Sequence, residues 1–240
     1  MRKRGPKPRE AVAREWTAHL AYCVGLLATD GCLYNDGRHI SFVSSDIQLV
    51  KLFKDLMKLS NKVGYKVSGS SGRRCPHIQF GNVGLYKWLL GIGLTPRKSL
   101  TLGPLKIPKQ FFVDFARGCF DGDGTIYSYM DPRWANSHMF YISFASASKT
   151  FTEWLQKQLI DIAGINGYIT TAKYENKNNM YQLRFAKKES LVLVKKMFYN
   201  KRVPCLERKR QKILNILKKH YGVQSENPRI FLSKSDILDI

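Results

Sequence analysis

The second half of the chain repeats the sequence pattern of the first half. Residues 20–31 and residues 112–124 are both apolar runs, and each ends in an aspartate followed by a glycine. A pattern that recurs at this spacing is typical of a supersecondary unit present in two copies. We therefore expect two related halves, each built around one copy of the run.

Each apolar run has a glycine near its centre, at Gly25 and at Gly118, and a second small residue four positions later, Thr29 or Gly122. Glycine inside a helix costs about 1 kcal/mol relative to alanine, so its presence in both copies calls for a compensating reason. Residues four apart lie on one face of a helix, where small side chains allow two backbones to approach closely. The pattern predicts two helices packed against each other along Gly25 and Gly118.

The acidic residues Asp30 and Asp123 then lie at the same end of the predicted helix pair. Each precedes a glycine suited to a left-handed helix stop. A carboxylate at a helix C-terminus is disfavoured by about 0.3 to 1 kcal/mol, so two of them in matching places have no obvious stabilising purpose. Two carboxylates held together are a natural site for hard cations such as Mg²⁺. We expect Asp30 and Asp123 to be metal ligands and catalytic residues; the alternative is that each merely ends a helix.

The segments that follow the two runs also correspond, and their apolar periodicity predicts the order αββαββα in each half, an α+β fold. The elements expected after the first run are a strand at 39–43, a helix at 46–59, a hairpin of 63–67 with 77–80, and a helix at 83–90. Those expected after the second run are strands at 124–129 and 139–145, a helix at 148–163, a hairpin of 168–174 with 180–185, and a helix at 189–199.

This order predicts a division of the chain into two repeats with basic ends. The expected parts are a basic flexible tail at 1–15, a first repeat at 16–94, a linker containing proline and glycine at 95–107, a second repeat at 108–203, a basic helix at 204–222 and a tail of unassigned role at 223–240. Prolines and glycines between periodic segments are typical of connecting segments.

The formal net charge of +22 is far from neutral. Such an excess of lysine and arginine favours complexes with polyanions, so nucleic acid is the first partner to consider. An anionic membrane is the rival, but no apolar run approaches the roughly 18 to 20 residues of a spanning helix, and no secretion signal is evident. The five cysteines form no C-x-x-C pair, which favours an intracellular, reducing compartment over a disulfide or zinc scaffold.

Residues 25–31 and 118–124 resemble the two LAGLIDADG motifs of monomeric homing endonucleases, and the resemblance extends over about residues 16–210. It implies motif helices at the central interface and antiparallel sheets that form a DNA-binding saddle. It also implies that the backbone carbonyls of Thr29 and Gly122 complete the metal coordination. The acid before the final glycine is kept in both copies, whereas the first acid of the motif is replaced by Ala28 in one copy and kept as Asp121 in the other.

The activity implied by the resemblance is site-specific hydrolysis of both strands of double-stranded DNA at a long asymmetric target, leaving short 3′ overhangs. Mg²⁺ is the expected metal, Mn²⁺ is expected to substitute for it, and Ca²⁺ to bind without cleavage. A monomer without an obligatory protein partner is expected to suffice for this activity, as in intron homing.

The family also carries basic residues just after the final helix of each half, where this chain has Lys98 and Lys209. The resemblance makes both of them candidates for polarising the scissile phosphate or the water network. Plain anchoring of a phosphate is the alternative for either lysine.

Base contacts are expected from sheet residues that point away from the helices. Alternation along residues 78–80 and 183–185 turns Gln79, Gln182 and Arg184 outward, where they can hydrogen-bond base edges in a major groove. The same surface is expected to include Ser41, Lys66, Arg73, Arg74, His77 and Lys173. For any one basic residue, phosphate contact is commoner than base contact.

Other functions of the same fold remain open at this point. Intron-splicing RNA maturases and non-cleaving DNA-binding regulators share it, and they often lack one or both motif acids. Both acids are present here. A basic structural protein of the nucleoid kind would explain the charge but not the repeated aspartates.

Overall fold

The computed structural model describes residues 15–67, 72–133, 137–173 and 178–221. The tail expected at 223–240 and all but the last residue of the tail expected at 1–15 lie outside these ranges. Among the helices of the described ranges, none combines the length and the apolar character needed to cross a membrane.

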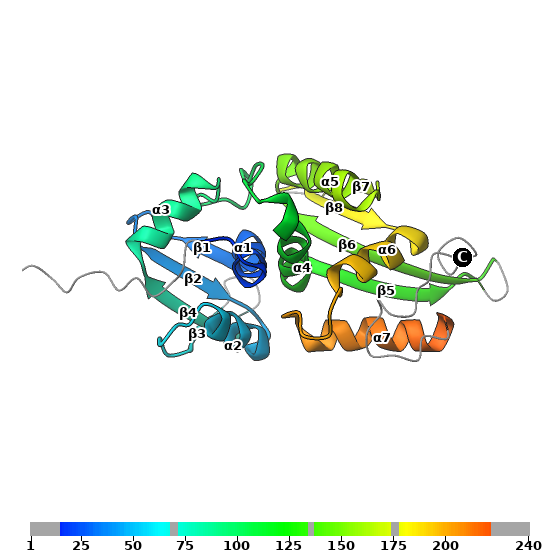
Figure 1. Ribbon diagram of the computed structural model, residues 1–240, viewed down its shortest axis with the longest axis horizontal. Coiled ribbons are helices and arrows are strands. Elements are labelled where there is room, and N and C mark those ends of the chain that lie inside the picture. Colours follow the sequence, from blue (N-terminus) through cyan, green and yellow to red (C-terminus); the bar gives the residue numbers. More distant parts are fainter. Residues whose placement is uncertain (1–14, 68–71, 134–136, 174–177, 222–240) are drawn as a thin grey trace, which may run out of the picture.

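Two sheets lie on either side of a central helix pair, α1 and α4 (Figure 1). The first half consists of α1 Ala18–Asp30, β1 Gly31–Leu33, β2 His39–Val43, α2 Ile47–Leu56, β3 Gly64–Val67, β4 Arg74–Gly81 and α3 Val83–Gly91. The second half consists of a 3-10 turn, η1 Lys109–Phe111, then α4 Phe112–Asp123, β5 Gly124–Met130, β6 His138–Ser146, α5 Lys149–Ala163, β7 Tyr168–Ala172, β8 Met180–Phe185 and α6 Lys187–Met197, followed by α7 Glu207–Tyr221. This order confirms the predicted α+β class and the repeated αββαββα topology.

Both sheets are antiparallel and four-stranded, with the matching orders β1-β2-β4-β3 and β5-β6-β8-β7. One face of each sheet carries buried apolar side chains, including Ile40 and Phe80 in the first sheet and Ile142 and Phe185 in the second. Helices α2 and α3 cover this face in the first half, and α5 and α6 cover it in the second (Figure 1). Within the described ranges, no helix covers the opposite face of either sheet.

The central helices are in contact backbone to backbone. An ideal Cβ placed on Gly25 would lie 2.8 Å from the Cys119 nitrogen and 2.9 Å from the Gly118 Cα. Every residue of α1 from Leu20 to Ala28 is buried, because this helix is enclosed by α4 on one side and by its own half on the others. The two helices therefore place their C-terminal ends beside each other at the centre of the molecule.

The segment between the repeats is packed rather than free. Leu102 and Leu105 are buried in the core. The Ser148 hydroxyl donates to the Leu102 carbonyl at 2.5 Å, which fixes the segment to the start of α5. Residues 95–107 thus hold a defined position between the halves, and this position determines where Lys98 points.

Candidate metal and nucleic-acid site

Asp30 and Asp123 are the last residues of α1 and α4, and β1 and β5 begin at the very next residues, Gly31 and Gly124. The left-handed helix stop expected at these glycines is wrong, because both are extended, with φ −85° and −77°. Glycine is needed there for space instead. An ideal Cβ on Gly31 would lie 2.6 Å from the Leu27 Cα, inside the turn that the chain makes on leaving the helix.

The two acids lie close enough to influence each other. The Asp30 Oδ2 would be 3.1 Å from a Cβ placed on Gly122, so the Asp30 carboxylate reaches across to the residue before Asp123. Burial, together with the negative charge of Asp123, raises the pKa of Asp30 to about 7, although the positive charges of Lys98 and Lys209 act in the opposite direction. Desolvation by the surrounding protein also raises the pKa of Asp123, while the same two lysines lower it.

Lys98 reaches the end of α1 from the segment between the repeats. Its side chain is buried, and Nζ donates to the carbonyls of Thr29 at 3.1 Å and Gly31 at 2.7 Å. Burial lowers the pKa of this ammonium group. These two carbonyls flank Asp30, so Lys98 places a positive charge against the unpaired carbonyls of the helix end.

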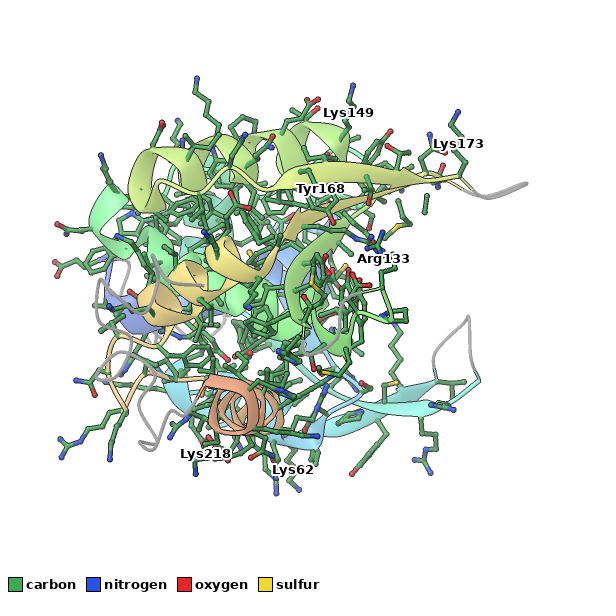
Figure 2. All side chains as sticks on the ribbon, turned by 90° about the vertical axis from the view of Figure 1, so that its right-hand side faces the viewer. Lys62, Arg133, Lys149, Tyr168, Lys173 and Lys218 are labelled. Atoms are coloured by element: carbon green, nitrogen blue, oxygen red, sulfur yellow. The ribbon has the colours of Figure 1, made fainter. Side chains whose placement is uncertain are left out.

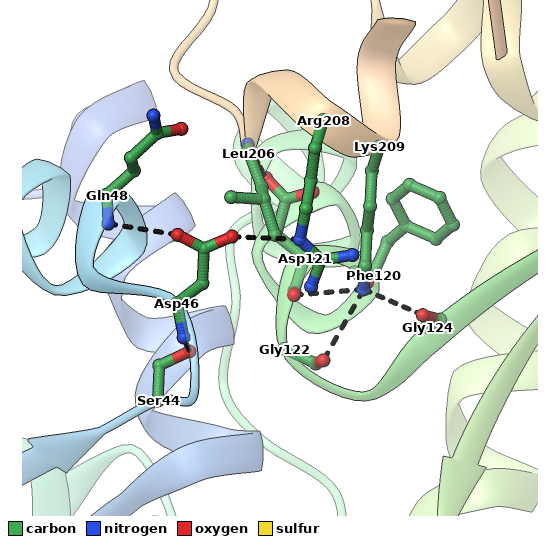
Figure 3. A network of polar contacts seen from close by, with 10 residues as sticks. All are labelled: Ser44, Asp46, Gln48, Phe120, Asp121, Gly122, Gly124, Leu206, Arg208 and Lys209. Atoms are coloured by element: carbon green, nitrogen blue, oxygen red, sulfur yellow. Dashed lines mark hydrogen bonds and ion pairs between the residues drawn. The ribbon is translucent and has the colours of Figure 1, made fainter. Parts of the chain in front are cut away.

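Lys209 does the same at the end of α4, from the first turn of α7 (Figure 3). Its buried Nζ donates to the carbonyls of Phe120 at 2.5 Å, Asp121 at 2.9 Å, Gly122 at 3.4 Å and Gly124 at 2.7 Å. Burial lowers the pKa of Lys209 to about 8. Each lysine follows the final helix of its own half, α3 or α6, and the two occupy equivalent positions in the structure.

The donor set fits a hard divalent cation. Two carboxylates, with the carbonyls of Thr29 and Gly122 beside them, offer the oxygen ligands that Mg²⁺ and Ca²⁺ take. Each carbonyl oxygen has a second lone pair besides the one that a lysine engages. Within the described ranges no third acid, histidine or cysteine joins Asp30 and Asp123 to form a larger metal-binding group.

Asp121 faces away from this pair and into the protein. Its Oδ2 accepts hydrogen bonds from the Tyr22 hydroxyl at 2.6 Å and from the Leu206 backbone nitrogen at 2.7 Å. Burial raises the pKa of this carboxyl group to about 6. Asp121 therefore joins α1, α4 and the segment that leads into α7.

Two cavities lie on either side of Asp123. One, of about 170 Å³, is lined by Ala28, Thr29, Lys98, Ser99, Leu102, Asp123, Ser146, Ala147 and Met180. The other, of about 390 Å³, is lined by Gly122, Asp123, Gly124, Thr125, Ile126, Arg208, Lys209 and Lys212. One acid is thus accessible from both sides, and each side has its own buried lysine.

Most residues expected on the outer sheet surfaces lie there. Gln79 is exposed between buried Ile78 and Phe80, and the cross-strand register places Lys66 and His77 on the same face. In the second sheet, the Arg184 Nε donates to the Gln182 Oε1 at 3.1 Å on the corresponding face. Arg73 and Lys173 are exposed next to the ends of β4 and β7.

Two residues expected on this surface are placed differently. Ser41 lies on the outer face but is only 3% exposed, because its short side chain lies below those of its cross-strand neighbours Cys32 and Gln79. Arg74 points to the opposite face from His77, since strand alternation groups it with Pro76 and Ile78. Its guanidinium lies 5.5 Å from the centre of the Tyr65 ring.

Sequence reasoning also missed residues at the site and on the outer face. Arg208 and Lys212 line the larger cavity at Asp123, and only the packing of α7 against β5 brings them there. Tyr127, Tyr129 and Tyr141 lie on the outer face of the second sheet. Their alternation with buried Ile126 and Phe140 is visible in the sequence and could have identified them.

Residues 113–198 match the family model of a LAGLIDADG-like domain. No curated protein is significantly similar to the chain. Among solved structures, meganuclease I-SmaMI bound to uncleavable DNA has a TM-score of 0.55 at 12% identity, covering 93% of this chain and 99% of that one. I-DmoI in complex with DNA and Ca has a TM-score of 0.52 at 13% identity, covering 82% of this chain and 97% of that one.

A third solved structure with this fold is that of DUF199/WhiA. Full-length DUF199/WhiA from Thermatoga maritima has a TM-score of 0.54 at 19% identity, covering 95% of this chain and 68% of that one. Identities this low show a common fold alone. Together with the order of its strands and helices, these matches show that the chain has the LAGLIDADG fold with two repeats.

Proposed function

We propose that this protein is a metal-dependent endonuclease that cuts both strands of a long asymmetric duplex DNA target and leaves short 3′ overhangs. The observation that carries the proposal is the placement of Asp30 and Asp123, one from each half, at adjoining helix ends that open to two cavities. The solved relatives I-SmaMI and I-DmoI, both in complex with DNA, support it at the level of the fold. A single chain supplies both acids, so a monomer without a protein partner suffices.

Asp30 and Asp123, with the carbonyls of Thr29 and Gly122, would hold the metal. Mg²⁺ is the proposed ion, with Mn²⁺ as a substitute and Ca²⁺ as an ion that binds without supporting cleavage. A bound divalent metal makes water a better nucleophile and neutralises charge on a scissile phosphate. The contribution of the chain is to hold two carboxylates together against their mutual repulsion, and Lys98 and Lys209 reduce that repulsion.

Duplex DNA would lie across the uncovered faces of the two sheets. The net charge of +22 favours such a complex at moderate ionic strength. The proposed contacts are made by Lys66, Arg73, His77 and Gln79 in the first half and by Lys173, Gln182 and Arg184 in the second. The protein would act inside the cell, at DNA.

A second candidate function is that of a non-cleaving DNA-binding regulator or an RNA maturase. The match to WhiA supports this second candidate, because WhiA has the same fold at 19% identity. The retained pair of acids favours the endonuclease. The two functions differ in one measurable respect, which is whether divalent metal and intact acids lead to broken phosphodiester bonds.

The test is cleavage of a randomised duplex library by the wild-type, Asp30→Asn and Asp123→Asn proteins, with Mg²⁺, with Ca²⁺ and with EDTA, followed by sequencing of the ends. Asp161→Asn is the matched control, because Asp161 is an exposed aspartate on α5. We expect staggered cuts at one recurrent site from the wild-type and control proteins in Mg²⁺ only. Recovery of one bound sequence without cuts in any metal would refute the endonuclease and support the regulator.

A further inference from the structure

The outer face of the second sheet is aromatic and almost uncharged, although the chain carries a net charge of +22. The strand register places on this face Thr125, Tyr127, Tyr129, Met139, Tyr141, Ser143, Ala145, Tyr168, Thr170, Ala172, Met180, Gln182 and Arg184. Within the described strands, Arg184 is the only charged side chain among them. A surface built to bind phosphates alone would carry more cations than this.

Three of these tyrosines form a stack. The rings of Tyr127 and Tyr141, which are directly opposite each other on β5 and β6, have centroids 4.9 Å apart and an interplanar angle of 6°. Tyr129 continues the stack, 6.2 Å from Tyr141 at an angle of 4°. The Arg184 guanidinium lies 6.0 Å from the centre of the Tyr127 ring. The rings support one another, so the surface is largely formed before any ligand arrives.

Positive side chains lie beyond two strand ends of this face rather than on it. Arg133 is exposed beyond the end of β5, where it forms an ion pair with Asp131 at 2.8 Å but keeps 78% of its side chain exposed. Lys173 is exposed beyond the end of β7. Figure 2, which views the molecule from the side of the second half, labels Arg133, Tyr168 and Lys173. Cations at the margin can contact the phosphodiester backbone of each DNA strand. The tyrosines then face the base edges on the floor of the groove between these strands.

The chemistry of the face selects among the bases. In the major groove, guanine is usually read by the donors of arginine or lysine, whereas thymine offers an apolar 5-methyl group and the O4 acceptor. Aromatic rings and the methyl groups of methionine and threonine can pack against the thymine methyl group. Tyrosine hydroxyls can donate a hydrogen bond to O4. The first sheet differs, since its outer face carries Lys66, His39, His77 and Gln79.

We infer that the second repeat reads a thymine-rich half of the target through contacts between thymine methyl groups and the Tyr127–Tyr141–Tyr129 stack. This rests on the proposed function only in that duplex DNA occupies the sheet face, and it does not require cleavage. The two halves would then recognise chemically different sequences, as an asymmetric target requires.

The experiment begins with selection of bound duplexes from a randomised library in Ca²⁺. Two variants assign each half of the target to a sheet. The half under the second sheet is the one whose selected bases change with Gln182→Ala but stay the same with Gln79→Ala. Thymines in each half are then replaced by uracil, which pairs identically but lacks the methyl group, and the Kd is measured. We expect about fourfold weaker binding for each contacted methyl removed from the second half, and unchanged binding for the first half.

Paired variants test the tyrosines themselves. Tyr127→Phe/Tyr129→Phe keeps the rings and should retain the discrimination between thymine and uracil, whereas Tyr127→Ser/Tyr129→Ser should abolish it. Thermal unfolding verifies that both proteins are folded, and the first half of the target serves as the internal reference for DNA binding.

Each other outcome is decisive. A selected second half without thymine, or equal Kd values for thymine and uracil, would overturn the inference while leaving the endonuclease intact. Equal binding of the corresponding single strand would also overturn it, since the rings would then act as a stacking platform for unpaired bases. Discrimination without cutting in Mg²⁺ would support the inference and refute the nuclease, and recovery of no duplex would overturn both.

Discussion

A methyl group placed on Gly118 would lie 3.0 Å from the Cα of Gly25, and one placed on Gly25 would lie 2.9 Å from the Cα of Gly118. This contact fixes how far apart the two halves are. It also fixes the separation of Asp30 and Asp123, because each acid lies five residues after one of these glycines along a rigid helix. The geometry of the candidate metal site is therefore set by residues that do not touch it.

Gly118→Ala should lower the free energy of unfolding by about 1 to 3 kcal/mol, the usual cost of overpacking, even though alanine is intrinsically the better helix former. Chemical denaturation measures the change. Gly91→Ala is the control, because a Cβ on this exposed helical glycine would meet nothing within 4 Å. The control should be neutral or slightly stabilising. Equal effects of the two changes would contradict the close approach of α1 and α4.

Asp121→Leu should destabilise the protein by about 1 to 3 kcal/mol, because the buried donors Tyr22 Oη and Leu206 N would lose their acceptor. Tyr22→Phe removes one of these bonds and should have the smaller effect in the same denaturation experiment. Asp121→Asn keeps an oxygen acceptor, so it should cut DNA at a near wild-type rate where Asp123→Asn does not. Complete loss of cleavage by a folded Asp121→Asn protein would assign Asp121 to the chemistry.

Lys209→Met should lower the free energy of unfolding more than Lys98→Met does. The Lys209 ammonium group lies within hydrogen-bond distance of four carbonyls, which share its three N–H donors, whereas Lys98 reaches two carbonyls. Hydrogen bonds involving a charged group contribute about 1.5 to 3 kcal/mol in favourable cases. Both variants should also slow the chemical step in single-turnover cleavage at saturating DNA. Unchanged single-turnover rates in a folded variant would leave that lysine with a purely structural role.

The ion pair between Arg208 on α7 and Asp46 at the N-cap of α2 joins the two halves at 2.8 Å (Figure 3). Arg208 is largely exposed, so the pair should contribute at most about 1 kcal/mol and weaken with salt. A double-mutant cycle of Arg208→Gln and Asp46→Asn measures the coupling. Asparagine is chosen at position 46 because its side-chain oxygen can still accept the capping hydrogen bond from the Gln48 nitrogen. A coupling well above this value, and insensitive to salt, would show that the pair is effectively buried.

The helix pair, the matched acids and the order of elements could be predicted because each depends on a local pattern. Gly25 with Thr29, and Gly118 with Gly122, show the contact face of each helix by spacing alone. The alternation around Gln79 and around Arg184 gives the outward face of each strand in the same way. Tyr127 and Tyr141 could have been identified by the same reasoning.

The sequence by itself thus determined that two like units exist, which face of each helix and strand is buried, and that Asp30 and Asp123 are equivalent. Only the tertiary structure decided that Ser41 is buried, that Asp121 is held by Tyr22 and Leu206 at separations of 99 and 85 residues, and that Lys98 and Lys209 meet matching helix ends. The physical reason is that periodicity depends on residues a few positions apart. Contacts between distant residues depend instead on how whole elements pack, which no local spacing records.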